Sequence, residues 1–314
     1  MKAAPRKVRR PRARPLLGIL SRKKSLYSTR RLIEAAKVRG YGSRVLDVLK
    51  CNLVLETGRP RLFHKGVEVE GLAVALPRIG ASVTLHGLNV VRQLEAQGVP
   101  LVNNAAAIGC SRDKLRALQM LAGAGVDIPR TVLARGGGDV DLLVQQVGGL
   151  PAILKLIQGT QGVGVMIAHS KAEVESILST MWNLGQEILL QEFIAESRGK
   201  DVRVLVVGSQ VVGAMRREAR TAGEFRSNLH RGGEGKPVVL DAVFAAAAVR
   251  AAQVLGLEVA GVDMLEARDG PKVMEVNSSP GFEGLEKATG LDIAAAIVER
   301  AAAMAEGARR AMGL

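Results

Sequence analysis

Short blocks of alternating apolar and polar residues occur along the whole chain, and segments with a helical period separate them. Alternation with a period of two indicates strands, whereas apolar residues three and four positions apart indicate one face of a helix. In the first third of the chain this pattern predicts strands at 16–21, 43–48 and 72–77 and helices at 28–39 and 88–97. A strand–helix–strand opening predicts a parallel, doubly wound α/β domain at the N-terminus.

Beyond residue 100 the pattern favours antiparallel pairs of strands. A single helix is expected over 105–124. Further strands are predicted at 131–134, 151–157, 165–168, 188–193, 200–207 and 211–217, and further helices at 140–147 and 171–184. The predicted fold class is therefore α/β, with α+β lobes following the doubly wound domain.

Two short strands joined by a tight turn are predicted over 261–281. Alternation places Glu275 and Asn277 on one face, and Met274 and Val276 on the other, toward a core. If the turn has three residues, Asp263 lies opposite Glu275, whereas a two-residue turn would send Asp263 to the other side. We expect the three-residue turn.

Oxygen ligands from Asp263, Glu275 and Asn277 would suit Mg²⁺, which binds one or two carboxylates and completes its shell with water and phosphates. The alternative is a solvated hairpin face that carries these charges by chance. The hairpin alone does not separate the two interpretations.

A glycine-rich loop follows the apolar strand that contains Lys155. Gly159, Gly162 and Gly164 have the order G-x-x-G-x-G, which is neither a dinucleotide fingerprint nor a Walker loop. Between two antiparallel strands, such a loop can form a flap whose backbone N–H groups approach phosphates. Many glycine hairpins bind nothing, so the loop alone is a weak signal.

Two other positions suggest ligand contacts. Asp201 and Arg203 alternate at the start of one predicted strand, where they are either functional or a strand-face ion pair. Arg78 follows the predicted strand at 72–77, and the carboxyl ends of parallel strands face ligands in doubly wound sheets. As an alternative, Arg78 is a surface arginine at a turn.

Composition narrows the class of protein. The chain has 314 residues, of which 47% are hydrophobic and only 3% aromatic, which favours an α/β enzyme over a protein that stacks nucleic-acid bases. Cys51 and Cys110 form neither a disulfide framework nor a zinc motif, which favours a reducing cytoplasm. No apolar run reaches the length that spans a bilayer.

The net charge of +14 is concentrated at the N-terminus, because residues 1–14 contain seven Lys and Arg and no acidic residue. We expect a disordered basic arm that could contact RNA or the ribosome, or that only improves solubility. The rest of the chain keeps a positive charge that suits anionic substrates.

Several motifs occur together in a fixed order: Gln-Glu-Phe-Ile at 191–194, Asp-x-Arg at 201–203, the run 225–233, Gly-Val-Asp at 261–263 and Glu-Val-Asn at 275–277. In this order they resemble the ATP-grasp superfamily, and specifically the RimK-type α-L-glutamate ligases, from residue 16 to about 305. The resemblance implies a basic arm at 1–14, a pre-ATP-grasp domain at 15–110, an ATP-grasp domain at 111–306 with lobes at 111–200 and 201–306, and a tail at 307–314.

The resemblance also implies a role for individual residues. Asp263, Glu275 and Asn277 would bind Mg²⁺ or Mn²⁺, with two ions in the site, and Arg203, Arg217 and Asn228 would act on the reacting carboxylate. The expected ATP-binding residues are Lys114, Lys155, Gly159, Gly162, Gly164, Glu192, Phe193, Asp201, Arg226, Ser227 and Asn228.

The implied activity is ATP- and Mg²⁺-dependent addition of L-glutamate, through α-peptide bonds and an acyl phosphate, to a C-terminal glutamate. The acceptor would be the sixth protein of the small ribosomal subunit or polyglutamate itself, and the enzyme a cytoplasmic homo-oligomer, a tetramer by resemblance. Two alternatives remain: a ligase acting on a carrier protein in lysine or arginine biosynthesis, and a non-catalytic nucleotide- or ribosome-binding protein.

Overall fold

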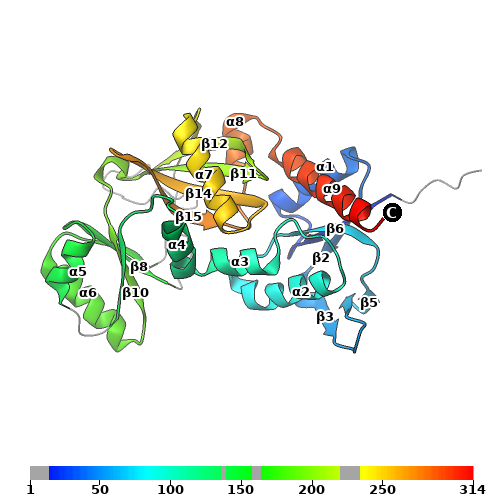
Figure 1. The fold of residues 1–314 in the computed structure, drawn as a ribbon, viewed down its shortest axis with the longest axis horizontal. Helices are drawn as coiled ribbons and strands as arrows, with labels where there is room; N and C mark the ends of the chain where they lie inside the picture. Colours follow the sequence, from blue (N-terminus) through cyan, green and yellow to red (C-terminus); the bar gives the residue numbers. More distant parts are fainter. Residues whose placement is uncertain (1–13, 136–138, 158–163, 220–233, 314) are drawn as a thin grey trace, which may run out of the picture.

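The computed structural model describes residues 14–135, 139–157, 164–219 and 234–313. Figure 1 shows a chain arranged in three bodies, with the N-terminal body at one end, a small central lobe at the other and a C-terminal lobe between them. None of the helices in the described ranges has the length and hydropathy needed to cross a membrane.

The N-terminal body is built on a parallel sheet with the strand order β2-β1-β6. Buried side chains of β1 alternate between two cores: Leu17 and Ile19 pack with α1 and with α9 (Ile293–Ala311), whereas Leu20 packs with α2. Helices therefore cover both faces, as the doubly wound prediction requires. The bounds are β1 Leu16–Leu20, α1 Tyr27–Val38, β2 Gly42–Leu46, β6 Leu72–Pro77 and α2 Thr84–Ala96.

A small antiparallel sheet, β3-β4-β5, extends from this body. Its strands are β3 Cys51–Val54, β4 Arg61–His64 and β5 Val67–Glu68. Short 3₁₀ helices lie at Val48–Lys50, Ala81–Val83 and Ala195–Ser197.

The helix expected over 105–124 is two helices, α3 Ala105–Arg112 and α4 Lys114–Gly123. Asp113 separates them because its backbone is extended (φ −87°, ψ 100°) and its Oδ1 accepts a hydrogen bond at 3.0 Å from the backbone N–H of Arg116. This is an N-cap, so the aspartate ends one helix and begins the next. The break allows Arg112 and Lys114 both to line one pocket.

The central lobe is a four-stranded antiparallel sheet, β7-β10-β8-β9, covered by α5 and α6. Alternate residues of β8 and β10, including Leu154 and Leu190, are buried against the helices. The bounds are β7 Thr131–Ala134, α5 Val140–Gln146, β8 Ala152–Leu156, β9 Val165–Ala168, α6 Lys171–Asn183 and β10 Ile188–Glu192.

The C-terminal lobe is a five-stranded antiparallel sheet, β13-β12-β11-β14-β15. Val204 and Val206 of β11 pack toward α7, whereas Leu205 and Val207 pack in the same core as α8, α9 and β1. This shared core joins the sheet to the N-terminal body. The bounds are β11 Lys200–Val207, β12 Gln210–Glu218, β13 Glu234–Pro237, α7 Ala242–Val254, β14 Val259–Ala267, β15 Gly270–Asn277, α8 Glu283–Thr289 and α9 Ile293–Ala311.

Asn103 fixes the same junction with a buried amide. Its Nδ2 donates to the carbonyl oxygens of Val259 and Ser278, both at 2.8 Å, and its Oδ1 accepts from the N–H groups of Glu258 and Val259. Four hydrogen bonds saturate the side chain. The entry to β14 and the exit from β15 are therefore held against the N-terminal body.

Candidate active site

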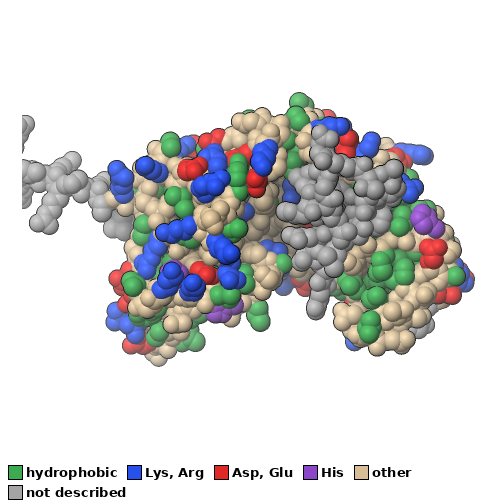
Figure 2. All heavy atoms as spheres, turned by 180° about the vertical axis from the view of Figure 1, so that it is seen from behind, with side chains coloured by type: hydrophobic (Ala, Val, Ile, Leu, Met, Phe, Trp, Pro, Cys, Tyr) green, Lys and Arg blue, Asp and Glu red, His purple; other side chains and the backbone are tan. Residues whose placement is uncertain are grey.

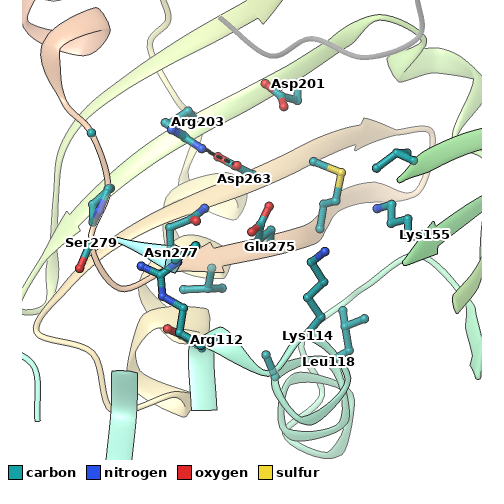
Figure 3. Close-up of a pocket in the computed structure, with 18 of the residues that line it drawn as sticks. Arg112, Lys114, Leu118, Lys155, Asp201, Arg203, Asp263, Glu275, Asn277 and Ser279 are labelled. Carbon is teal, nitrogen blue, oxygen red and sulfur yellow. Dashed lines mark hydrogen bonds and ion pairs between the residues drawn. The ribbon is translucent and has the colours of Figure 1, made fainter. Parts of the chain in front are cut away.

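A pocket of about 560 Å³ lies where the three bodies meet. Its walls come from the ends of β1 and β6, the α3–α4 break, strands β8 and β10, and the adjoining faces of β11, β12, β14 and β15. Figure 3 shows charged side chains from these elements converging on a common space. Pockets where domains meet are common ligand sites.

Asp263 lies directly opposite Glu275 on the neighbouring strand, as predicted. The predicted three-residue turn is wrong. Ala267 pairs with Gly270, so the turn contains two residues. A register shift between Asp263 and Met264 leaves Met274 as an extra residue in β15. A β-bulge of this kind adds one residue to one strand, and without it Met274 would face Asp263.

The bulge also corrects the prediction that Met274 points into the core. Val276 is buried, with 2% of its surface exposed, but Met274 is only partly buried and lines the pocket. The extra residue interrupts the strict alternation of faces, so Met274 and Glu275 both reach the pocket side.

Four charged residues form a buried network beside this hairpin. Arg203 donates to both oxygens of Asp263, from Nε to Oδ1 at 2.7 Å and from Nη2 to Oδ2 at 2.6 Å. Arg217 does the same to Asp201, its partner across β11 and β12, with Nε to Oδ1 at 2.6 Å, and its Nη2 also lies 3.2 Å from Asp263 Oδ2. Two carboxylates and two guanidinium groups balance in charge, which makes their burial possible.

The two facing carboxylates have opposite pKa shifts. Burial alone would raise the pKa of Asp263, but Arg203 and Arg217 hold it below its usual range. The pKa of Glu275 is raised, chiefly because the surrounding protein reduces the hydration of its carboxylate and then because Asp263 carries a like charge. The Glu275 side chain is exposed to the pocket and has no hydrogen bond or ion pair with the described residues. Glu275 is therefore the carboxylate whose charge is still available to a ligand.

Lys155 and Lys114 approach Glu275 from the opposite wall (Figure 3). Lys155 Nζ donates to Gln191 Oε1 at 2.6 Å, and Lys114 Nζ donates to the carbonyl oxygen of Leu156 at 3.1 Å. Burial lowers the pKa of Lys155 to about 8 against the opposing effect of Glu275. Both ammonium groups are thus positioned to meet an anion.

Gly164 is the one predicted flap glycine within the described ranges, since Gly159 and Gly162 lie outside them. Its φ is +74°, and a Cβ there would lie 2.7 Å from Leu156 Cδ1. Its carbonyl oxygen also accepts from Leu156 N–H at 3.0 Å, so Gly164 closes the β8–β9 hairpin tightly.

The predicted adenine segment lies at the end of β10, where Glu192 and Phe193 both line the pocket. The carboxylate of Glu192 is held by Arg130, with Nη2 to Oε1 at 3.1 Å and a further bond at 3.1 Å from the backbone N–H of Arg130. Arg226, Ser227 and Asn228 lie outside the described residues.

Some pocket residues were not assigned a role by sequence reasoning. Gln191 connects Lys155 to Thr131, whose Oγ1 accepts from Gln191 Nε2 at 2.8 Å. Gln191 and Glu192 are the two polar residues that end the apolar run of β10, and this position of Gln191 was the available signal. Arg112 was noticed only as part of a family motif, and Arg78, suggested from its position after β6, does line the pocket.

The donor set around Glu275 fits a hard divalent cation better than a transition metal. The described residues contain no cluster of three or more His, Cys, Asp or Glu that could hold a metal. Two facing carboxylates and the amide of Asn277 are oxygen ligands that Mg²⁺ accepts when phosphates and water complete its shell. Asn277 Nδ2 is buried and has no hydrogen-bond partner in the part of the chain that the structure describes, so the amide nitrogen is not bonded to another group there.

Comparisons with known proteins agree with this geometry. Residues 16–108 match the RimK PreATP-grasp domain, and residues 111–301 match the RimK-like ATP-grasp domain. A probable alpha-L-glutamate ligase from Nitrosococcus oceani is 49% identical over 283 residues, which cover 90% of this chain and 94% of that protein.

Solved structures share the fold. A RimK domain ATP-grasp protein from Sphaerobacter thermophilus is 26% identical, with a TM-score of 0.69 over 92% of this chain and 99% of that one. The ATP-grasp ligase PsnB, in complex with a variant of a minimal precursor, Mg and ADP, is 20% identical, with a TM-score of 0.71 over 93% of this chain and 99% of that one. The predicted fold class and the enzyme class of carbon–nitrogen ligase are confirmed at the level of the family. The chain belongs to the RimK-like ATP-grasp ligase family.

Proposed function

We propose that this protein is an ATP-dependent ligase that joins L-glutamate, through α-peptide bonds, to a C-terminal glutamate carboxylate. The observation that carries the proposal is a set of cations and carboxylates converging on one pocket, in a chain about half identical to a probable alpha-L-glutamate ligase. Transfer of the γ-phosphoryl group to the acceptor carboxylate would give an acyl phosphate, and attack by the amine would release phosphate and form the amide.

In this proposal ATP lies between the central and C-terminal lobes. Lys114 and Lys155 contact its phosphates, the segment of Glu192 and Phe193 receives adenine, and Asp201 lies near the ribose. Asp263, Glu275 and Asn277 hold Mg²⁺ or Mn²⁺, which when bound neutralises the charge that develops on the phosphates. PsnB, with Mg and ADP, supports a nucleotide and a metal in this fold.

Arg203 and Arg217 have different accessibility, which suggests different roles. The Arg203 side chain is 18% exposed and Arg217 only 5%. We assign Arg203 to the reacting carboxylate, where a guanidinium can bind both oxygens. Arg217 is a positioning residue, because its hydrogen bonds to Asp201 and Asp263 fix both carboxylates.

The remaining features of the proposal concern context. A peptide acceptor is supported by PsnB, which was solved with a precursor. A ribosomal small-subunit acceptor, RNA contact through residues 1–14, a cytoplasmic location, a homotetramer, two metal ions and the domain boundaries at 15–110 and 111–306 remain proposals from the sequence.

Glutamate-dependent phosphate release tests the function. The protein with ATP, Mg²⁺ and a peptide that ends in glutamate should release phosphate with L-glutamate and much less with L-lysine, L-aspartate or D-glutamate. Activity with another amino acid and none with L-glutamate would favour the carrier-protein ligase, and no amino-acid-dependent release would favour a non-catalytic nucleotide-binding protein.

A further inference from the structure

Two further arginines, Arg78 and Arg112, line the pocket. Arg78 directly follows β6, and its backbone N–H donates to the carbonyl oxygen of Leu20 at 2.9 Å. Arg112 is the last residue of α3. Each guanidinium makes one hydrogen bond to a backbone carbonyl, from Arg78 Nη2 to Pro280 at 2.6 Å and from Arg112 Nη2 to Ile79 at 2.5 Å.

Neither guanidinium has a carboxylate partner among the described residues, unlike Arg203 and Arg217. The Nε atoms of both Arg78 and Arg112 are buried without any hydrogen bond. The Arg78 guanidinium also lies over the ring of Phe282, 5.7 Å from its centroid, which encloses it further. Burial and the neighbouring charge of Arg112 lower the pKa of Arg78 to about 10.

Two partly buried like charges with no carboxylate in ion-pair contact among the described residues are unfavourable, because one carbonyl bond each replaces only part of the hydration that they have lost. A purely structural role would use the backbone carbonyl bonds and leave this cost unexplained. Each guanidinium has five N–H donors in a planar fork, so most of them remain available to a ligand. A bound carboxylate would supply both the missing charge and the missing acceptors.

The arginines and the lysines lie at different ends of the metal-binding residues. Figure 3 shows Arg112 beside Asn277 and Ser279, whereas Lys114 lies beside Glu275 and faces Lys155. Asn277 contributes a third buried donor, its Nδ2, which has no partner among the described residues. The lysine end adjoins Gly164, because Leu156 bonds both to Lys114 and to Gly164, and it suits phosphates, so the arginine end is left for the other anionic substrate.

Figure 2 shows that Lys and Arg side chains also gather on the visible face of the N-terminal body (left). Such a surface raises the local concentration of anions by electrostatic attraction. This surface attracts phosphates and carboxylates alike. Selection of a carboxylate therefore depends on residues inside the pocket, for which Arg78 and Arg112 are the candidates.

We propose that Arg78 and Arg112 form a carboxylate-binding subsite that holds a non-reacting carboxylate of a glutamate substrate. The proposal rests on the ligase function above, and deepens it by naming the residues that select an acidic substrate. The carboxylate belongs either to the incoming free glutamate or to the terminal glutamate of the acceptor. A planar fork binds both oxygens of a carboxylate, which an ammonium group cannot do.

The test compares Arg78→Lys, Arg78→Gln and Arg112→Lys with Arg92→Gln as a matched control. Arg92 is exposed on α2, and its one side-chain bond among the described residues is to Asn89 Oδ1, at 3.1 Å. We expect KM for a glutamate substrate to rise about 10- to 100-fold in the Arg78 and Arg112 variants, the range expected from losing a hydrogen bond to a charged group. Thermal unfolding of each variant is measured beside the kinetics.

Separate KM measurements for free L-glutamate and for the acceptor peptide identify which glutamate is bound. A rise in KM for free L-glutamate with an unchanged KM for the acceptor peptide assigns the subsite to the incoming substrate, and the reverse assigns it to the acceptor. If the subsite holds the side chain of the incoming glutamate, replacing L-glutamate by L-glutamine, which lacks the side-chain charge, should cost the wild type far more than the variants. Unchanged KM values for both free L-glutamate and the acceptor peptide in folded variants would overturn the subsite.

Failure of the ligase function is distinguished by binding alone. L-Glutamate is titrated calorimetrically into the protein with Mg²⁺ and a non-hydrolysable ATP analogue. Heat in the wild type and the control that disappears in Arg78→Gln supports the subsite even if no ligation is found. The same titration is made with the peptide that ends in glutamate, and the subsite is refuted if neither ligand binds the wild type more strongly than it binds Arg78→Gln.

Discussion

Arg203 neutralises Asp263 through two parallel hydrogen bonds, whereas Glu275, directly opposite Asp263, has no such partner among the described residues. The two carboxylates are thus unequal before any cation arrives. Asp263 is held in place by protein, and Glu275 carries the charge that a cation can neutralise. In the proposed metal site, hydrogen bonds therefore fix the position of Asp263, whereas the negative charge of Glu275 still lacks a partner among the described residues.

Replacing Glu275 by glutamine tests this asymmetry. We expect Glu275→Gln to raise the Mg²⁺ concentration for half-maximal ADP formation at least about tenfold, as losing a charged metal ligand should, without lowering the melting temperature, because repulsion from Asp263 is removed. Mg²⁺ titrations and thermal unfolding measure both effects. Glu266→Gln is the control, since Glu266 lies on the neighbouring strand β14, pairs with Arg216 and does not line the pocket. A clear loss of stability in Glu275→Gln would contradict the asymmetry.

Arg217 should matter for stability more than its neighbour Arg216. Removing one partner of a buried ion pair leaves an uncompensated charge, so Arg217→Gln should lower the free energy of unfolding by about 3–5 kcal/mol. Arg216→Gln should cost about 0–1 kcal/mol, because its pair with Glu266 is more than one-third exposed. Urea denaturation compares the two variants. Equal losses would mean that the network with Asp201 does not carry this stability.

The chain pattern predicted the main elements around the site but not two local irregularities. Period-two alternation predicted that Glu275 and Asn277 share one face of a strand. An apolar residue such as Met274 fits either a core position or a bulge, so the bulge could not be read from the pattern. Asp113 fits a helix surface as well as a cap, which concealed the α3–α4 break. Both irregularities aim charged side chains into the pocket.

Long-range pairs were harder to predict than local ones. Asp201 and Arg203 were considered as partners because they are two residues apart, but each bonds instead to a residue on a neighbouring strand. Arg78 and Arg112 meet only through packing of β6 against the α3 region, which no period in the sequence encodes. The family motifs identified the residues, and the fold supplied their partners.

Nucleotide binding should depend on pH through Lys155. Its pKa of about 8 means that the free protein loses this positive charge as the pH rises through 8, while bound phosphates favour the charged form. ATP affinity, measured by calorimetry, should therefore fall between pH 7 and 9. Lys155→Arg stays charged over this range and should show a flatter profile. Identical profiles would exclude Lys155 as the cause.

The basic arm should act on acceptor recruitment and not on chemistry. Deleting residues 1–14 removes seven positive charges, so RNA affinity and its salt dependence should both decrease, while phosphate release with free L-glutamate stays unchanged. Filter binding and the phosphate assay measure the two effects. Replacing the seven Lys and Arg by Gln separates charge from length. Loss of activity on free glutamate would show that the arm takes part in catalysis.

The most direct test of the ligase account is mass spectrometry of the reaction products. The protein is incubated with ATP, Mg²⁺, L-glutamate and a peptide that ends in glutamate. The account predicts a ladder of products spaced by one glutamyl residue, formed with stoichiometric ADP and absent without Mg²⁺. ADP formation without extended peptide or polyglutamate, or extension by a different amino acid, would contradict it.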